Sequence, residues 1–574
     1  MTGDSVTDGG ATDFRQLDQR IREAKAWLAQ DPDEVTRREL GAIVDDALKG
    51  SAEAADELSS RFGSRLAFGT AGLRGEIGAG PNRMNRVLVG QAAAGFAAWL
   101  QARDERSLSI VIGYDGRTNS RVFARDTAEI FAGAGIRAIL LPRTLPTPVL
   151  AFAVRHLGAS AGVMVTASHN PPRDNGYKVY LGDEDEGSQI VSPVDGEIAA
   201  HIDRIAAGVS VLELPRSDDY EIAAQEVVDA YVEATAALVG PAKATPRVLY
   251  TAMHGVGWET VAAVFEAAGL QAPDVVTEQI EPDAAFPTVA FPNPEEPGAL
   301  DLAYAAATRL GAGLIIANDP DADRLAIAIP SDTEENGWYR LTGNEVGLLL
   351  GWRAADRLSA SGERGALAAS LVSSPGLSVI ADAYGLPYRD TLTGFKWVSR
   401  VPNLAYGFEE ALGYLVDPAK VRDKDGISAA VELVGLVAEL HAAGRTLGDQ
   451  LDALAERFGA FASGQISIRV TDLADIGVIT DRLRKQPPAS LGGIAVESID
   501  DFRLGVDGFP PSDILRYRLV GGSRVIVRPS GTEPKLKVYL DAQAGGATAA
   551  IARAEADAVV AALDAALRPL LTLA

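Results

Sequence analysis

The chain contains no cysteine among its 574 residues. This absence excludes disulfide bonds, thiolate metal ligands and cysteine nucleophiles, so any bound metal must be held by oxygen atoms or histidine. It is compatible with a reducing compartment. Long apolar runs are also missing, and the segment Met1–Asp13 is polar and acidic, without the apolar centre of a signal peptide. We therefore expect a soluble, cytoplasmic protein.

Positive charge is scarce as well. The chain has 53 Lys and Arg against 78 Asp and Glu, which gives a formal net charge of −25. Nucleic acids are bound through an excess of Lys and Arg, so this balance argues against such a partner, and nothing indicates a membrane partner. An anionic small molecule would require cations concentrated locally. The cations in or beside the motifs described below are Arg74, Arg117, Lys178, Arg324, Lys396, Arg528, Lys535 and Lys537.

The length exceeds what one hydrophobic core supports, and three to five domains are expected. Apolar residues at helical spacing predict helices over 14–62, and Ser192 followed by Pro193 predicts a capped helix that ends near Ala206. From Val87 onward helices and strands alternate, which is typical of α/β domains with helix-covered sheets. We predict a helical extension over 1–67, α/β domains over 68–215, 216–330 and 331–456, and a smaller C-terminal α+β domain over 457–574.

A β-branched apolar run ends at Thr166, and the polar turn that follows carries Ser168, His169, Asn170 and Pro171. This pattern predicts a strand that delivers a serine hydroxyl to a loop. A serine before Asn-Pro is also an ordinary strand-ending turn. His169 is adjacent, but neighbouring side chains usually diverge, so the sequence does not decide whether it serves Ser168.

Three aspartates alternate after a second apolar strand, at Asp319, Asp321 and Asp323. Carboxylates at this spacing can converge on one hard cation, and ligation by oxygen alone favours Mg²⁺. An EF-hand is excluded, because Arg324 and Pro330 stand where that loop needs glycine and glutamate. An acidic turn and an aspartyl-phosphate enzyme remain as alternatives. The second of these leaves Ser168 and the C-terminal loop without roles.

Two further loops carry polar groups at the ends of predicted strands. Glu409 and Glu410 could accept hydrogen bonds from neighbouring sugar hydroxyls, although such pairs are common on helices. Arg528, Ser530, Gly531 and Thr532 combine a guanidinium fork, two hydroxyls and a glycine turn, which is the chemistry of a phosphate-binding loop. An ordinary Ser-Gly turn explains Gly531 but not Arg528. The chain has no nucleotide-binding P-loop motif.

In this order and combination the four motifs resemble those of the α-D-phosphohexomutase superfamily, the phosphoglucomutases and phosphomannomutases. The resemblance is closest to the branch with phosphoglucomutase-2 and phosphopentomutase, through Phe68–Gly75, Asp174–Tyr180 and Thr393–Trp397. It implies three similar α/β domains with mixed sheets and a smaller, divergent fourth domain around a central cleft. It also implies a phosphoserine at Ser168 in the active enzyme.

The resemblance further implies roles for individual residues. The catalytic group comprises Ser168, His169, Lys178, Lys396 and Arg74, with Asp115-Gly116-Arg117 supporting the first domain's site. The Mg²⁺ ligands are Asp319, Asp321, Asp323 and a phosphate oxygen on Ser168. The substrate-binding residues are Arg324, Thr393, Gly394, Glu409, Glu410, Arg528, Ser530, Gly531, Thr532 and Lys535. Many relatives have serine two residues after the sugar-binding glutamate, and here that position is Ala411.

We therefore predict a Mg²⁺-dependent phosphosugar mutase. Phospho-Ser168 would donate its phosphoryl group to a hexose monophosphate, form a 1,6-bisphosphate and recover the other phosphate. Glucose phosphates are the first choice, mannose phosphates the second and pentose phosphates the third, with glucose 1,6-bisphosphate as intermediate and activator. We expect sugar phosphates as the partners and a monomer or weak dimer. A catalytically silent sugar-phosphate-binding homologue is the alternative of another class, against which the intact Ser168 and aspartates argue.

Overall fold

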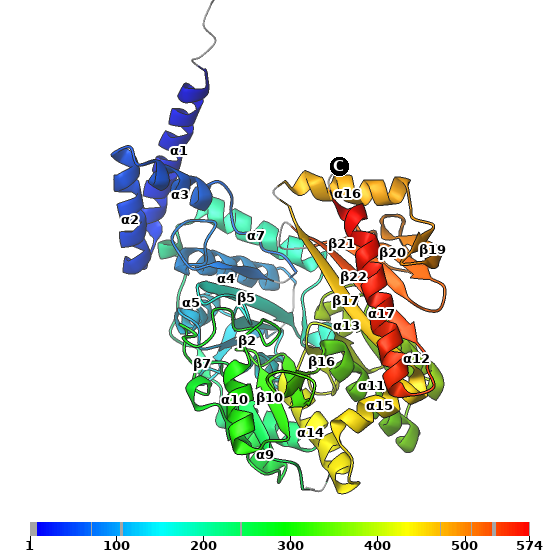
Figure 1. Ribbon diagram of the computed structural model, residues 1–574. Helices are drawn as coiled ribbons and strands as arrows, with labels where there is room; N and C mark the ends of the chain where they lie inside the picture. Colours follow the sequence, from blue (N-terminus) through cyan, green and yellow to red (C-terminus); the bar gives the residue numbers. More distant parts are fainter. Residues whose placement is uncertain are drawn as a thin grey trace, which may run out of the picture. The chain divides into compact units, whose positions relative to one another are not determined.

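The computed structural model describes residues 8–70, 72–103, 107–240, 244–470, 472–506, 508–530 and 535–572. It divides into two compact units. Unit 1 comprises Met1–Ala242, Arg247–Leu325 and Ala419–Ile427, and unit 2 comprises Lys243–Pro246, Ala326–Pro418 and Ser428–Ala574. Figure 1 shows the helices and strands of both units.

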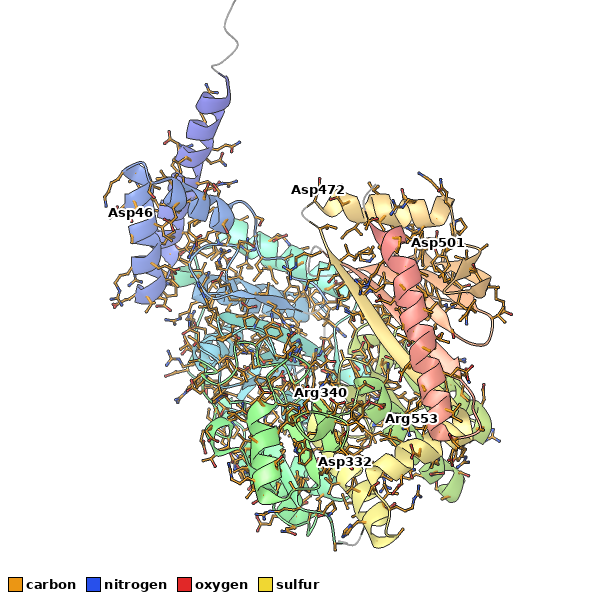
Figure 2. All side chains as sticks on the ribbon, viewed as in Figure 1. Asp46, Asp332, Arg340, Asp472, Asp501 and Arg553 are labelled. Carbon is orange, nitrogen blue, oxygen red and sulfur yellow. The ribbon has the colours of Figure 1, made fainter. Side chains whose placement is uncertain are left out.

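Unit 1 begins with three helices, α1 (Asp8–Gln30), α2 (Glu34–Leu48) and α3 (Ala52–Phe62). The N-caps of α2 and α3 are Asp33 and Ser51, whose side chains accept from Val35 N and Ala54 N. Trp27 meets Phe62 edge to face, with ring centroids 6.2 Å apart. These helices lie together at the N-terminal end of the ribbon, and Figure 2 labels Asp46 on α2. The predicted helical extension is therefore present.

The first α/β sheet of unit 1 has the strand order β1-β5-β4-β2-β3-β7, with β6 paired to β5. The strands β4, β2 and β3 are parallel, whereas β5 runs antiparallel to both β4 and β1. The apolar helices α4 and α7 pack against each other beside it. The strands are β1 (Leu73–Glu76), β2 (Ser109–Tyr114), β3 (Arg137–Leu140), β4 (Ala161–Val165), β5 (Asp174–Leu181), β6 (Ser188–Gln189) and β7 (Glu221–Ile222), and the helices are α4 (Arg86–Gln101), α5 (Ser120–Gly133), α6 (Thr147–His156) and α7 (Val194–Gly208).

The second α/β part of unit 1 places β8 between β10 and β9, with both neighbours parallel to it. Because parallel strands end at the same edge, the loops after β8 and β10 meet: Val256 N donates to Pro320 O over 2.9 Å. The elements are α8 (Gln225–Ala236), β8 (Val248–Thr251), α9 (Gly257–Ala267), β9 (Asp274–Val275), α10 (Asp301–Leu310) and β10 (Leu314–Asn318).

Unit 2 contains an antiparallel pair, β11 with β12, and a mixed sheet of order β14-β13-β15-β16. Thr342 and Glu345 form a capping box at the start of α11, which fixes where that helix begins. The elements are β11 (Leu325–Pro330), β12 (Trp338–Arg340), α11 (Gly343–Ser361), β13 (Ala366–Ser370), α12 (Gly376–Tyr384), β14 (Tyr388–Thr391), α13 (Phe395–Val398), β15 (Leu404–Glu409), β16 (Gly413–Leu415), α14 (Gly426–Ala442) and α15 (Leu447–Phe458).

The C-terminal part of unit 2 is an antiparallel sheet of order β17-β22-β21-β20-β19-β18. The helix α17 packs along β17 and β22, and Figure 2 labels Arg553 on it, where Arg553 pairs with Asp452 of α15. The elements are β17 (Ala460–Arg469), α16 (Leu473–Lys485), β18 (Ser490–Leu491), β19 (Ile494–Asp501), β20 (Leu515–Leu519), β21 (Arg524–Pro529), β22 (Lys535–Ala544) and α17 (Ala549–Leu567). Short 3₁₀ turns span Asp183–Asp185, Val211–Glu213, Thr277–Gln279, Phe502–Leu504 and Arg568–Leu571.

The predicted fold class is confirmed: mixed α/β sheets, a C-terminal α+β part and an N-terminal helical extension. The predicted Ser192 N-cap is wrong. Pro193 occupies that position with φ −90° and ψ −2°, and none of the side chains that the structure describes caps α7. Among the described residues no single helix is long and apolar enough to cross a membrane, and α14 and α15 meet that test only as a pair bent by 94°.

Candidate active site

Ser168 lies on the loop that joins β4 to β5, as the sequence predicts. The strand β4 is buried along its whole length, so the chain must turn sharply where the apolar run ends. Ser168 makes that turn with φ 50°, a left-handed conformation that residues other than glycine adopt rarely. Its backbone N–H donates to Thr166 Oγ1 over 2.9 Å, and the residue is only 2% exposed.

The hydroxyl of Ser168 has two partners. It donates to Asp319 Oδ2 over 2.6 Å, and it lies 3.2 Å from His169 Nδ1. Neighbouring side chains usually diverge on extended backbone, but the left-handed turn at Ser168 brings the side chains of Ser168 and His169 to one side of the loop.

The three alternating aspartates converge after β10. One carboxylate oxygen from each of Asp319, Asp321 and Asp323 lies within 4.8 Å of the others, and all three residues are buried. Within the described part of the chain, Asp321 Oδ1 and Asp323 Oδ1 are buried without a hydrogen-bond partner. A buried, unpartnered carboxylate oxygen is costly unless a cation meets it. The donor set therefore fits a hard divalent cation such as Mg²⁺.

Lys178 points from β5 into this cluster. Its Nζ lies 2.7 Å from Asp321 Oδ2 and 2.8 Å from Asp323 Oδ2. Burial would raise the pKa of Asp321, but attraction to Lys178 outweighs burial and lowers it. By contrast, burial followed by repulsion from Asp321 and Asp323 raises the pKa of Asp319 well above its ordinary value. Three carboxylates thus repel one another in one buried cluster, and a bound divalent cation would relieve this repulsion.

Two residues of the cluster were not anticipated from the sequence. Thr147, at the start of α6, donates to Asp321 Oδ2 over 2.6 Å. Lys424 Nζ lies 3.3 Å from Asp323 Oδ2. A threonine that begins a helix gives no local signal of this contact. The Asp423-Lys424-Asp425 run, inserted between apolar segments, was the available signal for Lys424.

Arginines surround the serine loop. Arg74 Nη1 donates to Asn170 Oδ1 over 3.3 Å, and Arg324 Nε lies 3.8 Å from Asp323 Oδ1. Burial, followed by the charges of Arg324 and Arg74, lowers the pKa of His169 well below its ordinary value. The charged form of His169 is therefore disfavoured in this environment. The predicted residues Ser168, His169, Lys178, Arg74, Arg324 and the three aspartates all lie in unit 1.

The predicted sugar-binding loop lies in unit 2, at the end of β15. Glu409 Oε1 accepts from Gly394 N over 2.7 Å, so the Thr393-Gly394 loop and the glutamate are held together. Lys396 follows on α13 and is half-buried. Glu410 Oε2 accepts from Ser373 Oγ over 2.9 Å and from Ser370 Oγ over 3.2 Å, which points to a structural use of this carboxylate.

The predicted phosphate loop follows β21. Arg528 is half-buried, and its Nε donates to Pro529 O over 3.3 Å. Ser530 N donates to Lys535 O over 2.7 Å, which closes the loop at its base. Gly531 and Thr532 lie outside the described residues. The roles of all these residues remain predictions.

The fold and the serine, carboxylate and lysine cluster define a multidomain α/β phosphoryl-transfer enzyme. Comparison with known families identifies it further. Four models described as Phosphoglucomutase/phosphomannomutase match the chain in order: alpha/beta/alpha domain I at 65–208, domain II at 229–332, domain III at 342–458 and the C-terminal domain at 466–558. The chain belongs to the α-D-phosphohexomutase superfamily, as an isomerase of the phosphoglucomutase/phosphomannomutase type.

Individual relatives agree with this assignment. The "Probable phosphomannomutase" of Haemophilus influenzae is 57% identical over 80% of this chain and 93% of its own length. The "Phosphopentomutase" of Homo sapiens is 34% identical over 93% of this chain and 92% of its own length. A phosphoglucomutase/phosphomannomutase family protein from Burkholderia thailandensis has a similar fold, with a TM-score of 0.67 and 19% identity over 88% of this chain and 98% of its own.

Proposed function

We propose that this enzyme interconverts the 1-phosphate and the 6-phosphate of a hexose, with glucose favoured, by way of phospho-Ser168. The phosphoserine O–P bond breaks as a sugar hydroxyl forms a new bond to the same phosphorus, which produces a 1,6-bisphosphate. The bisphosphate turns over, and its other phosphate returns to Ser168. In the first transfer the sugar hydroxyl loses a proton and the serine oxygen gains one. In the return transfer the serine hydroxyl loses a proton and the released sugar oxygen gains one.

The hydrogen bond of 2.6 Å from Ser168 Oγ to Asp319 Oδ2 carries this proposal. It places the Ser168 hydroxyl against the carboxylate cluster, where a phosphoryl group on Ser168 would lie beside a bound cation. His169 Nδ1 lies 3.2 Å from the same oxygen, within reach to exchange a proton with it. Lys178 would offset the charge of about −1.5 to −2 that a phosphoserine carries.

Mg²⁺ is the proposed cofactor, and Asp319, Asp321 and Asp323 are the residues that would hold it. When bound, the ion would neutralise the charge that develops on the phosphoryl oxygens. The Oδ1 atoms of Asp321 and Asp323 support this assignment, because among the described residues they are buried without a hydrogen-bond partner.

The residues proposed for recognition lie in unit 2. Glu409 would accept hydrogen bonds from two adjacent sugar hydroxyls, and the bond from Gly394 N to its Oε1 holds the carboxylate beside the Thr393-Gly394 loop. Arg528 would bind the phosphate that does not react, because a guanidinium fork matches two phosphate oxygens at once. A phosphatase would not need this second anion site, whereas a mutase must hold either end of the sugar.

Mannose 1-phosphate is the second candidate substrate, favoured by the 57% identity to the Haemophilus influenzae protein. Ribose 1-phosphate is the third, favoured by the 34% identity to the human phosphopentomutase. Ala411 removes a hydroxyl that could contact the sugar, and one neutral hydrogen bond is worth about 0.5–1.5 kcal/mol net. Discrimination between the sugars should therefore be modest.

Coupled assays of the purified enzyme against glucose, mannose and ribose 1-phosphates test the proposal. We expect the highest kcat/KM for glucose, measurable turnover of the others, and a change of about two- to tenfold in their ratio in Ala411→Ser. Glu409→Ala should lose far more, because it removes a charge-assisted bond. Glucose 1-phosphate ranking last, or Glu409→Ala behaving like wild type, would reject the proposed sugar recognition.

A further inference from the structure

Arg117 lies between β2 and α5 and is only 4% exposed. Its two terminal nitrogens donate to four backbone carbonyls of the loop that carries Ser168. Nη2 donates to Ser168 O over 2.6 Å and to Asn170 O over 2.5 Å. Nη1 donates to Pro171 O over 2.8 Å and to Asp174 O over 3.1 Å. One guanidinium therefore holds the whole loop from the serine to the start of β5.

The first of these contacts acts on a strained residue. Ser168 has φ 50°, which disfavours a side chain with a Cβ, and such a conformation persists only where its surroundings determine it. Thr166 Oγ1 holds the N–H of Ser168, and Arg117 holds its carbonyl. Together these bonds fix both peptide planes that flank the serine, and thereby the direction of its Oγ.

Arg117 is itself held from two sides. Its Nε lies 3.6 Å from Asp115 Oδ2, and its guanidinium lies 4.9 Å from the centre of the Phe286 ring. Phe286 is 3% exposed, so this cation–π contact is shielded from water, where such contacts are strongest. A Cβ added at Gly116 would lie 2.9 Å from Pro282 Cβ, which shows how closely the 282–286 segment packs on this turn.

We propose that Arg117 is a positioning residue for phosphoryl transfer, which holds Ser168 in the left-handed conformation that aims its oxygen at Asp319 and His169. Phe286 packs against the guanidinium and thereby keeps it within hydrogen-bond distance of the four carbonyls. The proposal rests on the proposed function of Ser168 as the phosphoryl carrier. It assigns Arg117 no contact with the sugar, so its removal should lower kcat and leave KM nearly unchanged.

The geometry of the donor matters more than its charge. Four carbonyls spread over the loop match the planar fork of arginine, whereas a lysine at this position offers one nitrogen and cannot reach all four. A displacement of about 1 Å in a reacting group is enough to cost about 100-fold in rate. Arg117→Lys should accordingly resemble Arg117→Ala rather than the wild type.

The test compares Arg117→Ala, Arg117→Lys and Phe286→Leu with a matched control, Arg137→Ala. Arg137 also makes a bidentate contact, with Glu221 in the same unit. Its side chain is 55% exposed, and this contact involves no residue of the Ser168 loop. For glucose 1-phosphate we expect kcat of both Arg117 variants to fall about 100-fold with KM within about threefold. Added guanidinium chloride, at millimolar concentration, should raise kcat of Arg117→Ala and leave Arg137→Ala unchanged. Phe286→Leu should lower kcat about three- to tenfold.

Three results would overturn the proposal: kcat of a folded Arg117→Ala within threefold of wild type, wild-type kcat in Arg117→Lys, or no response of folded Arg117→Ala to guanidinium. If Arg117→Ala does not fold, Phe286→Leu decides, and an unchanged kcat there rejects the proposal. Ser168→Ala is measured in the same series. Activity retained by Ser168→Ala would reject the proposed function instead, so the two failures are distinguishable.

Discussion

The serine loop of unit 1 and the binding loops of unit 2 are built differently. In unit 1 Ser168 is 2% exposed and Asp319 and Asp321 are fully buried, and each already has partners among neighbouring side chains. In unit 2 Glu409, Arg528 and Ser530 are only half-buried. Bond-making groups gain from fixed, water-excluded geometry before the substrate arrives. Side chains that recognise the substrate must exchange bound water for the ligand, so they remain accessible to solvent. The difference predicts losses of kcat in unit 1 and rises of KM in unit 2.

The largest effect should come from Ser168→Ala. Removing the hydroxyl removes the proposed phosphoryl carrier, so kcat should fall at least about 10⁴-fold, as for other covalent nucleophiles. Coupled assays and intact-mass analysis measure activity and phosphate content. Ser160→Ala, just before β4, is the control and should remain active. Phosphate found on Asp319 or Asp321, and never on Ser168, would contradict the proposed mechanism.

Asp321→Asn should cost about 10²–10³-fold in kcat, because it removes a proposed ligand of Mg²⁺ and one partner of Lys178. EDTA should inactivate the wild type, and added Mg²⁺ should restore it but not the variant. The control Asp332→Asn changes an exposed aspartate, labelled in Figure 2, and should behave as wild type. Full activity after exhaustive metal removal would show that the cluster needs no cation.

Arg528→Lys tests the unit 2 half of the comparison. A point charge replaces the bidentate fork, so KM for glucose 1-phosphate should rise about tenfold with kcat within a few-fold. Steady-state kinetics separate the two constants. Arg518→Lys is the matched control, because its side chain is 47% exposed and pairs with Asp500. An unchanged KM in Arg528→Lys would show that this loop does not bind the phosphate.

The smallest effect concerns pH and His169. Burial lowers the pKa of this side chain in the folded protein, whereas in the unfolded chain it is about 6.5. Below pH 6.5 the unfolded state therefore binds a proton that the folded state does not, and stability falls as pH falls. The loss at pH 5.5 should be about 1.4 kcal/mol at most and absent in His169→Gln.

Urea-unfolding curves of both proteins at pH 7.5 and 5.5 measure this difference. Because the wild type and His169→Gln share all other titratable groups, only the additional loss of unfolding free energy in the wild type is attributed to His169. An equal response of the two proteins to pH would show that the histidine is protonated in the folded state as easily as in the unfolded chain.

Local pattern was sufficient for much of this protein. The apolar run before Thr166 and the Asn170-Pro171 turn predicted β4 and its loop, and the alternation of Asp319, Asp321 and Asp323 predicted a shared carboxylate cluster. The prediction that Ser192 caps α7 failed, because the helix begins one residue later and Pro193 is its N-cap. The domain boundaries and the roles of the site residues stay predictions.

The sequence alone therefore determined the strands, the turns and the chemistry available at each strand end, because these depend on residues a few positions apart. Only the tertiary structure decided which ends meet. Ser168 contacts Asp319 across 151 positions, and Lys178 enters the aspartate cluster from β5. Thr147 joins the cluster from the start of α6, and Lys424 joins it from the loop before α14. Such contacts follow from strand order and burial, which no local pattern encodes.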